Sequence, residues 1–232
     1  MVQMKPDRVR IVQSFDELIA TPFSGAVNAL CWQRDIAGDF QEILDQLPAG
    51  SGVTQIDGDC LHALALGPAG STARDVLLAD QAMLRHHGLS PSLDCISGYP
   101  QDDDRGPVPT DVYSFHVDSA PVPADTFLCT YIGNPSEGLS NEWAMRRIDM
   151  PKTRTQLLQT YGGADDEDFD AYLTDNCFDL HYWPLPYAQP YSFGLGNLWR
   201  IAIAHPSSLV LPCIHRAPVA QPGGSARLLL IS

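Results

Sequence analysis

The stretch YSFHVDSAP, residues 113–121, places a histidine and an aspartate two residues apart in a segment that otherwise has the composition of a β-strand. Side chains alternate between the two faces of a strand, so His116 and Asp118 point to one side, away from Phe115 and Val117. An imidazole and a carboxylate on one face can together ligate a divalent metal ion. A strand end whose polar residues face water is the simpler interpretation of so short a motif.

The C-terminal stretch SSLVLPCIHRAPVAQPGGSARLLLIS supplies a second histidine, His215, then a Pro/Gly-rich turn and a final predicted strand that opens with Arg227. With the first pair, His215 completes a set of two imidazoles and one carboxylate, which holds Fe(II) on one face and leaves other positions open. Arg227 shares a strand face with Leu229 and Ile231. If that face is the interior, an unpaired guanidinium there is costly and needs an anionic partner.

The order of these residues resembles the Fe(II)/2-oxoglutarate-dependent dioxygenase superfamily: a His-x-Asp pair, a long gap, a distal histidine, and an arginine that begins the last strand. The pattern FHVD, LCTYIG, HRAP and RLLL also resembles an uncharacterised bacterial family of unknown function. The resemblance covers residues 113–133 and 207–232. It implies that His116, Asp118 and His215 form the catalytic centre and bind Fe(II). It also implies that Arg227 binds the distal carboxylate of 2-oxoglutarate.

Tyr131 lies on the strand predicted after the His-x-Asp pair, where related enzymes often place a hydrogen-bond donor to the cosubstrate. A core aromatic residue is the alternative interpretation of Tyr131. His181 could line the mouth of the pocket. The remaining candidates are weaker, because a turn, a structural ion pair, a lid or an ordinary surface element explains them as well; they are His205, Arg216, Trp143, Arg146 and Arg147.

The elements expected to position these residues change in type along the chain. Residues 1–91 carry helical patterns, among them SFDELIA with a capping box and STARDVLLADQAMLRHHG with an apolar stripe. From residue 92 onward, short β-like runs alternate with Pro and Gly, interrupted by a helical insert near 152–176. We predict a single domain over residues 1–232, mainly β with N-terminal helices (α+β). The helical part, 1–91, packs on a double-stranded β-helix or jelly-roll (cupin-like) core formed by 92–232.

The charge balance narrows the class of partner. The chain has 14 Lys and Arg against 28 Asp and Glu, a net charge of −14, which repels phosphate backbones and anionic lipid surfaces. We therefore expect a small-molecule substrate, with no nucleic acid and no membrane as partner. The six cysteines are far apart without a CxxC pair, and the N-terminus has no apolar run resembling a signal peptide. These features predict a cytoplasmic protein with free thiols, present as a monomer or homodimer.

The expected function is that of a non-haem iron oxygenase, an enzyme that uses O2 and 2-oxoglutarate to hydroxylate, desaturate or cyclise a small molecule. Two alternatives fit the same residues. An iron oxygenase or oxidase without 2-oxoglutarate would draw its electrons from the substrate itself. A non-catalytic cupin-like metal-binding protein would hold another divalent ion, since two imidazoles and a carboxylate also suit zinc.

Overall fold

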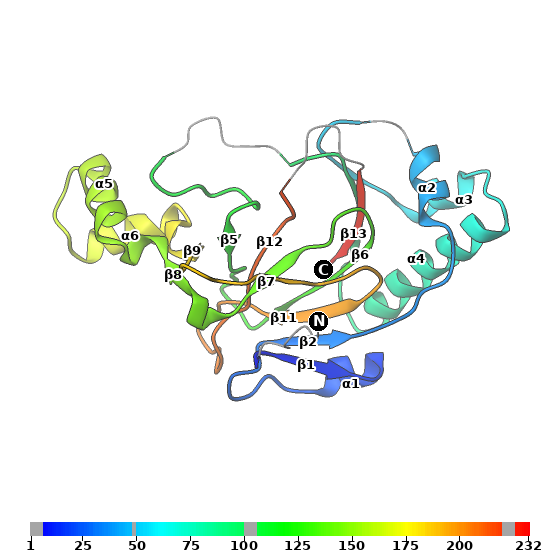
Figure 1. The fold of residues 1–232 in the computed structure, drawn as a ribbon, viewed down its shortest axis with the longest axis horizontal. Coiled ribbons are helices and arrows are strands. Elements are labelled where there is room, and N and C mark those ends of the chain that lie inside the picture. Colours follow the sequence, from blue (N-terminus) through cyan, green and yellow to red (C-terminus); the bar gives the residue numbers. More distant parts are fainter. Residues whose placement is uncertain (1–6, 48–49, 100–105, 220–225) are drawn as a thin grey trace.

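Two β-sheets with helices at both ends make up the chain, as the computed structural model in Figure 1 shows. The structure describes residues 7–47, 50–99, 106–219 and 226–232. The fold is mixed α/β and mainly β with some helices, which confirms the coarser part of the predicted fold class.

The larger sheet has seven strands and runs through the middle of the molecule. The pair at one edge, formed by residues 9–12 and 29–32, is parallel, and every other pairing in this sheet is antiparallel. In spatial order the strands are β1 (Val9–Val12), β2 (Ala29–Trp32), β11 (Leu198–Ala202), β6 (Asp125–Ile132), β13 (Arg227–Ile231), β4 (Ser92–Ile96) and β3 (Val53–Gln55).

The smaller sheet has six short strands, all antiparallel. In spatial order they are β10 (Tyr191–Ser192), β7 (Glu137–Leu139), β12 (Ile214–Arg216), β5 (Phe115–His116), β9 (His181–Pro184) and β8 (Ala144–Arg146). Its two central strands carry the histidines of both sequence motifs. The predicted metal ligands therefore meet in this sheet.

Strand alternation gives the larger sheet two different faces. On β6 and β13, Phe127, Cys129 and Leu228 pack toward the N-terminal helices, in a core that includes Leu77 and Leu84. The opposite face carries Leu128, Trp199 and Leu229, which pack with residues of the smaller sheet, among them Tyr191 and Cys213. Both sheets therefore share one apolar core, and we call the face of each sheet that is turned to it the inner face.

Four helices cover the outer face of the larger sheet: α1 (Phe15–Ala20), α2 (Phe40–Gln46), α3 (Gly58–Ala63) and α4 (Pro68–His86). The expected cap is present on α1, where the Ser14 side chain accepts a hydrogen bond from the Glu17 backbone N–H. In Figure 1, α2, α3 and α4 lie together at one end of the molecule. The helices therefore pack on the outer face of the larger sheet and do not cover its inner face.

The helical interpretation of residues 1–91 was incomplete, because this segment also supplies three strands, β1, β2 and β3, to the larger sheet. Each is only three or four residues long, too short to establish a two-residue period. The sequence of β2, ALCW, is apolar on both faces, and three of its four residues are buried. A strand buried on both faces carries no alternating pattern.

The predicted helical insert is confirmed as α5 (Pro151–Tyr161) and α6 (Glu167–Asp175), which have an apolar cluster of their own that includes Leu157 and Phe169. Three 3₁₀ turns flank the insert: η1 (Asn141–Trp143), η2 (Arg147–Asp149) and η3 (Phe178–Leu180). Figure 1 shows α5 and α6 at the end of the molecule opposite α2–α4. The insert therefore lies next to β8 and β9, at one edge of the smaller sheet.

Cys60, Cys95, Cys129, Cys177 and Cys213 are free thiols, as expected. No helix in the described ranges is both long enough and apolar enough to cross a membrane.

Candidate metal centre

The smaller sheet brings the two histidines of the distant sequence motifs face to face. His116 on β5 and His215 on β12 are directly opposite each other in the antiparallel register, and their ring centroids are 4.6 Å apart. Directly opposite residues share a face of the sheet. Asp118 follows β5 on the same alternation, so its carboxylate lies on that face too. His116 and His215 therefore lie on neighbouring strands as predicted, whereas Asp118 lies beyond the end of β5.

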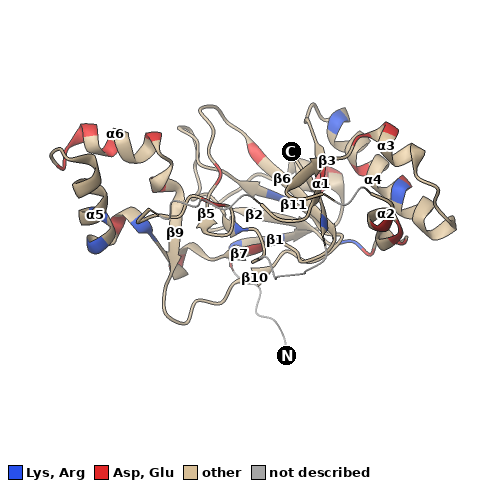
Figure 2. Cartoon of the chain, turned by 90° about the horizontal axis from the view of Figure 1, so that it is seen from above, with Lys and Arg blue, Asp and Glu red and all other residues tan. Residues whose placement is uncertain are grey.

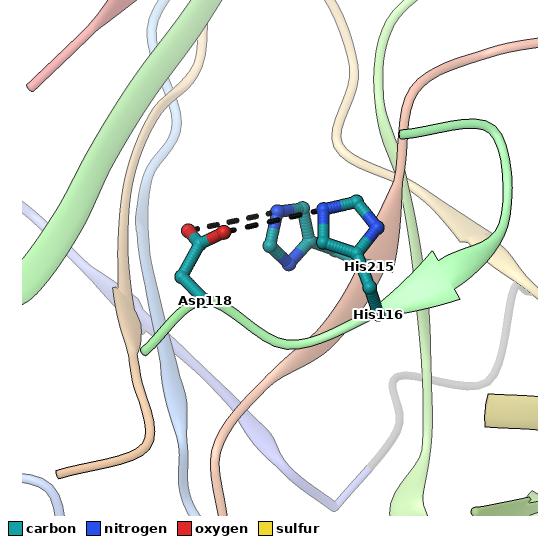
Figure 3. Close-up of side chains that lie close together, drawn as sticks. All are labelled: His116, Asp118 and His215. Carbon is teal, nitrogen blue, oxygen red and sulfur yellow. Dashed lines mark ion pairs between the residues drawn. The ribbon is translucent and has the colours of Figure 1, made fainter. Parts of the chain in front are cut away.

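Figure 3 shows the three side chains converging, with both oxygens of Asp118 turned toward imidazole nitrogens. His116 Nε2 is 4.0 Å from Asp118 Oδ1, and His215 Nε2 is 3.8 Å from Asp118 Oδ2. The donor atoms of all three residues lie within 4.8 Å of one another. Metal–ligand bonds in imidazole and carboxylate sites are about 2.0–2.2 Å, so these donor atoms would have to move closer together for one ion to contact all three.

Backbone contacts orient both imidazoles. Nδ1 of His116 is 2.8 Å from the Ser114 carbonyl oxygen, and Nδ1 of His215 is 3.3 Å from the Cys213 carbonyl oxygen. When Nδ1–H donates to a carbonyl, the lone pair remains on Nε2, the atom that faces Asp118. The Thr126 hydroxyl donates to Asp118 Oδ2 at 2.6 Å and holds the carboxylate. Each of the three candidate ligands thus has a hydrogen-bonding contact that helps to fix the orientation of its side chain.

The electrostatics of the pair favour uncharged imidazole. Burial, together with the neighbouring His215, lowers the pKa of His116 to about 4. Near pH 7, His116 is therefore neutral, and neutral imidazole is the form that binds a metal ion. The arrangement is ready to accept a cation without first releasing a proton from His116.

Arg227 occupies the inner face of the larger sheet, as its alternation with Leu229 predicts. Its side chain is 5% exposed, and its Nη2 donates to Thr130 Oγ1 at 3.0 Å and to Ser136 Oγ at 3.1 Å. Nε and Nη1 are buried and have no hydrogen-bond partner. Within the described ranges, no carboxylate comes within ion-pair distance of Arg227. Burial lowers the pKa of this guanidinium.

The contact with Ser136 connects Arg227 to the metal-ligand strands. Ser136 directly precedes β7, whose Gly138 is opposite His215 in the register. Two residues along an extended chain span about 7 Å. Arg227 is therefore hydrogen-bonded to a residue two positions along the chain from the one that is opposite His215.

The surroundings of Arg227 contain polar residues that the sequence analysis missed. Thr130 and Ser136 contact its guanidinium directly, and Tyr99 and Tyr113 interact with it electrostatically. The Tyr99 backbone N–H also donates to the Tyr113 hydroxyl at 2.9 Å. Tyr113 stands in the same YSFHVDSAP stretch as the ligands, which was a usable signal. The positions of the other three depend on strand pairing, which the sequence does not display.

The role predicted for Tyr131 does not fit its position. Its side chain lies on the outer face of β6, where its hydroxyl donates to Asp80 Oδ2 at 2.6 Å and its ring stacks on Phe40. Thr126 and Thr130, which contact Asp118 and Arg227, occupy the inner face of the same strand. The alternative interpretation, a core aromatic, is the one that the structure supports.

The weaker candidates lie apart from the triad, with one exception. Arg216 pairs with Glu137 and stacks on Phe115, on the outer face of the smaller sheet. His205 lies at a turn, where its Nδ1 is near the Ser207 hydroxyl. The exception is His181, whose ring centroid is 5.7 Å from that of His116. Of the other candidates, Trp143 and Arg146 are exposed, Arg146 pairs with Asp149, and the guanidinium of Arg147 lies over the ring of Trp183.

No family model matches this chain, and no curated protein or solved structure is significantly similar to it. The resemblance in motif order therefore stays a prediction. What the structure adds is geometry: a converging set of two imidazoles and one carboxylate, of which His215 is buried and the other two are partly buried, and, on the larger sheet, a buried arginine without an ion-pair partner among the described residues.

Proposed function

We propose that the protein is an Fe(II)- and 2-oxoglutarate-dependent oxygenase that oxidises a small molecule. The observation that carries the proposal is the combination of the His116–Asp118–His215 set with the unpaired guanidinium of Arg227. Either feature alone has another explanation. Together they provide donor atoms for a divalent cation and an unpaired guanidinium for an anionic group, the two needs of a chelating dicarboxylate.

The residues fit both groups chemically. Two neutral imidazoles and one carboxylate match the ligand set of non-haem Fe(II) sites, and the single negative charge leaves the site with a net charge of about +1. An anionic chelator is attracted to such a site. Arg227 offers a planar fork of N–H donors that matches a carboxylate with two parallel hydrogen bonds. When bound, iron and 2-oxoglutarate would supply the activation of O2 and the oxidising power.

The chain's own residues bind, orient and shield. His116, Asp118 and His215 would hold the metal, and Thr126 and the two backbone carbonyls hold those ligands in place. Arg227 would fix the far end of the cosubstrate, with its remaining N–H group held by Thr130 and Ser136. The apolar residues of the shared core limit access of water from the sides.

The sheet arrangement agrees with a double-stranded β-helix core, the finer fold that we propose. Two antiparallel strands of the smaller sheet carry the ligands, and the last strand of the chain, in the larger sheet, carries the arginine. The inner faces of both sheets contribute to one core. This pattern is that expected from the resemblance in motif order.

The charge distribution favours a small substrate over an anionic polymer. In Figure 2, acidic residues are conspicuous on α6, and basic residues are scattered without a continuous basic stripe. A nucleic-acid partner needs such a stripe to neutralise phosphates. A small molecule that enters between the sheets does not.

The proposal is tested by measuring O2 consumption and succinate release by the Fe(II)-reconstituted protein, with and without 2-oxoglutarate, in the presence of a small-molecule metabolite extract. We expect O2 uptake that requires 2-oxoglutarate and releases succinate in equal amount. Uptake that is independent of 2-oxoglutarate would instead support an iron oxidase. No uptake, with retention of Zn(II) in metal analysis, would support the binding-protein alternative.

Variants of the ligands make the test specific. His116→Ala, Asp118→Ala and His215→Ala should each abolish stoichiometric Fe(II) binding and turnover, with the fold retained. His205→Ala is the matched control, because His205 lies at a turn away from the triad and should bind iron as the wild type does. A ligand variant that binds iron with wild-type stoichiometry would remove that residue from the site.

A further inference from the structure

The row of histidines across the smaller sheet continues past the metal centre. His215 is opposite His116, and His116 is opposite His181 on β9. Directly opposite residues share a face, so all three imidazoles lie on the inner face of the smaller sheet. The centroids of His116 and His181 are 5.7 Å apart, which makes His181 the immediate neighbour of a metal ligand.

An arginine lies close to His181. Arg147 is the first residue of η2, directly after β8, and its positive charge acts on the His181 imidazole. The guanidinium of Arg147 lies over the ring of Trp183, 4.8 Å from its centroid. Trp183 is two residues from His181 and on the same face of β9. An imidazole, a guanidinium and an indole thus lie together, and the imidazole of His181 is the one next to His116.

His181 differs from the metal ligands in how it is held. Its side chain is buried, 4% exposed, yet its Nδ1 has no hydrogen-bond partner. In His116 and His215, Nδ1 is fixed by a backbone carbonyl, and Nε2 faces Asp118. His181 lacks this support and is not part of the group whose donor atoms converge. Its ring nitrogen is therefore available to a group that is absent from the free chain.

Arg147 is also without a partner for its charge. Its Nε is buried and makes no hydrogen bond, and in the described part of the chain no carboxylate lies within ion-pair distance of it. The nearest influence is Asp111, but that carboxylate already accepts hydrogen bonds from the backbone N–H groups of Tyr113 and Ser114. A half-buried guanidinium that is desolvated and unpaired points to an anionic ligand.

We propose that His181 and Arg147 bind a carboxylate group of the primary substrate, and that the apolar body of the substrate packs against Trp183 and Met145. Trp183 and Met145 are opposite each other on β9 and β8 and are 47% and 42% exposed, a pair of large apolar side chains open to solvent. This inference rests on the proposed function, which places the reacting centre next to His181.

The charge of the subsite selects a carboxylate over a phosphate. One guanidinium and one neutral imidazole supply a single positive charge, which matches one carboxylate. A doubly charged phosphate would be left half compensated in a protein whose net charge is −14. The subsite is also separate from the one proposed for 2-oxoglutarate, because Arg227 lies on the larger sheet and Arg147 at the edge of the smaller one.

The test compares benzoate with its neutral analogue benzamide, using ligand-observed NMR titration of the metal-free protein. We expect benzoate to bind at least tenfold more tightly than benzamide. Arg147→Met should weaken benzoate binding by roughly 10- to 100-fold, the effect of losing a charged hydrogen bond. His181→Phe should weaken it severalfold. Arg146→Met is the matched control and should leave it unchanged, because Arg146 is exposed and pairs with Asp149.

Further variants keep the outcome decisive. If Arg147→Met fails to fold, Arg147→Lys retains the charge without the fork and should still weaken benzoate binding severalfold. Equal affinity for benzoate and benzamide, or wild-type affinity in the Arg147 variants, would overturn the inference. Loss of benzoate binding in Arg227→Met alone would overturn it too, by assigning the anion to Arg227.

The experiments distinguish failure of the proposed oxygenase function from failure of the proposed carboxylate subsite. Fe(II) binding should be unchanged in Arg147→Met, so a wild-type protein that binds benzoate selectively but no iron would contradict the oxygenase and not the carboxylate subsite.

Discussion

A buried guanidinium without a carboxylate beside it destabilises the folded protein. Arg227 is 5% exposed and has two buried nitrogen atoms that make no hydrogen bond. Leaving a buried charge uncompensated typically costs about 3–5 kcal/mol. A residue of this kind is explained by a ligand that completes it. His181 and Arg147, in the smaller sheet and directly after it, also have buried nitrogen atoms without a hydrogen-bond partner among the described residues. By the same reasoning, we assign them a carboxylate ligand.

Burial of His181 makes the stability of the protein depend on pH. Its pKa is lowered from the ordinary 6.5 to about 4 by burial and by the positive charges of its neighbours. The unfolded chain therefore binds a proton at pH values where folded His181 does not, so stability falls as the pH decreases from about 6.5 toward 4 and is unaffected above that range. His181 alone should contribute a loss of about 2 kcal/mol between pH 7.5 and pH 5.

The measurement is urea unfolding of the metal-free protein, in the presence of a chelator, at pH 7.5 and pH 5. The loss of stability on acidification should be about 2 kcal/mol smaller in His181→Gln than in the wild type. An identical loss in both proteins would mean that His181 titrates normally and is not desolvated.

The residues that the sequence predicted to lie close together, and that do, are those fixed by strand alternation together with a chemical requirement. Two imidazoles and one carboxylate have a recognisable purpose only if they meet, and His116, Asp118 and His215 do meet. The role predicted for Tyr131 did not fit, because strand alternation defines two faces but does not show which face is turned to the site. The hydroxyl groups near Arg227 depend on which strands are paired, and that is long-range information.

At the scale of elements, the arrangement depends on very short strands. β5 has two residues and β12 has three, yet their pairing sets the position of both histidines. Most of the predicted β-like runs after residue 92 contain strands, and the two inserted helices are present, but the run SSLVLPCIH is not a strand before Ile214, and Leu209 within it is exposed. The strands β1, β2 and β3 were missed, because three or four residues carry no period and because an edge strand is defined by its neighbour as much as by its own sequence.

One glycine shows how closely two elements approach near Arg227. Gly133 follows β6 with φ of +87°, and a Cβ placed on it would lie 2.6 Å from Arg227 Cβ. Gly162, at the end of α5, has a similar φ of +76° but open space around it. Alanine at either position incurs the cost of a left-handed conformation, about 1–2 kcal/mol. Only at Gly133 does it also collide with the strand that carries Arg227.

We therefore expect Gly133→Ala to destabilise the protein by about 1–3 kcal/mol more than Gly162→Ala does. Chemical denaturation of the two variants and the wild type measures the difference. Equal destabilisation would show that β6 and β13 have room at this point, contrary to the structure.

At the scale of the whole molecule, the proposed cosubstrate spans the space between the two sheets. The metal ligands belong to the smaller sheet and its extension, and Arg227 belongs to the larger one. A dicarboxylate bound at both ends would therefore tie the sheets together and stabilise the folded state by mass action. The net charge of −14 opposes the approach of any anion, so binding must come from these specific groups and not from the overall field.

The central claim is tested most directly by calorimetric titration of the Fe(II)-loaded protein with 2-oxoglutarate under anaerobic conditions. We predict one molecule bound per chain, with affinity reduced about a hundredfold or more in Arg227→Met and less severely in Arg227→Lys, while iron binding stays intact. Arg216→Met, which removes an arginine from the outer face of the smaller sheet, should bind 2-oxoglutarate as the wild type does. Unchanged affinity in Arg227→Met, or no binding by the iron-loaded wild type, would contradict the account.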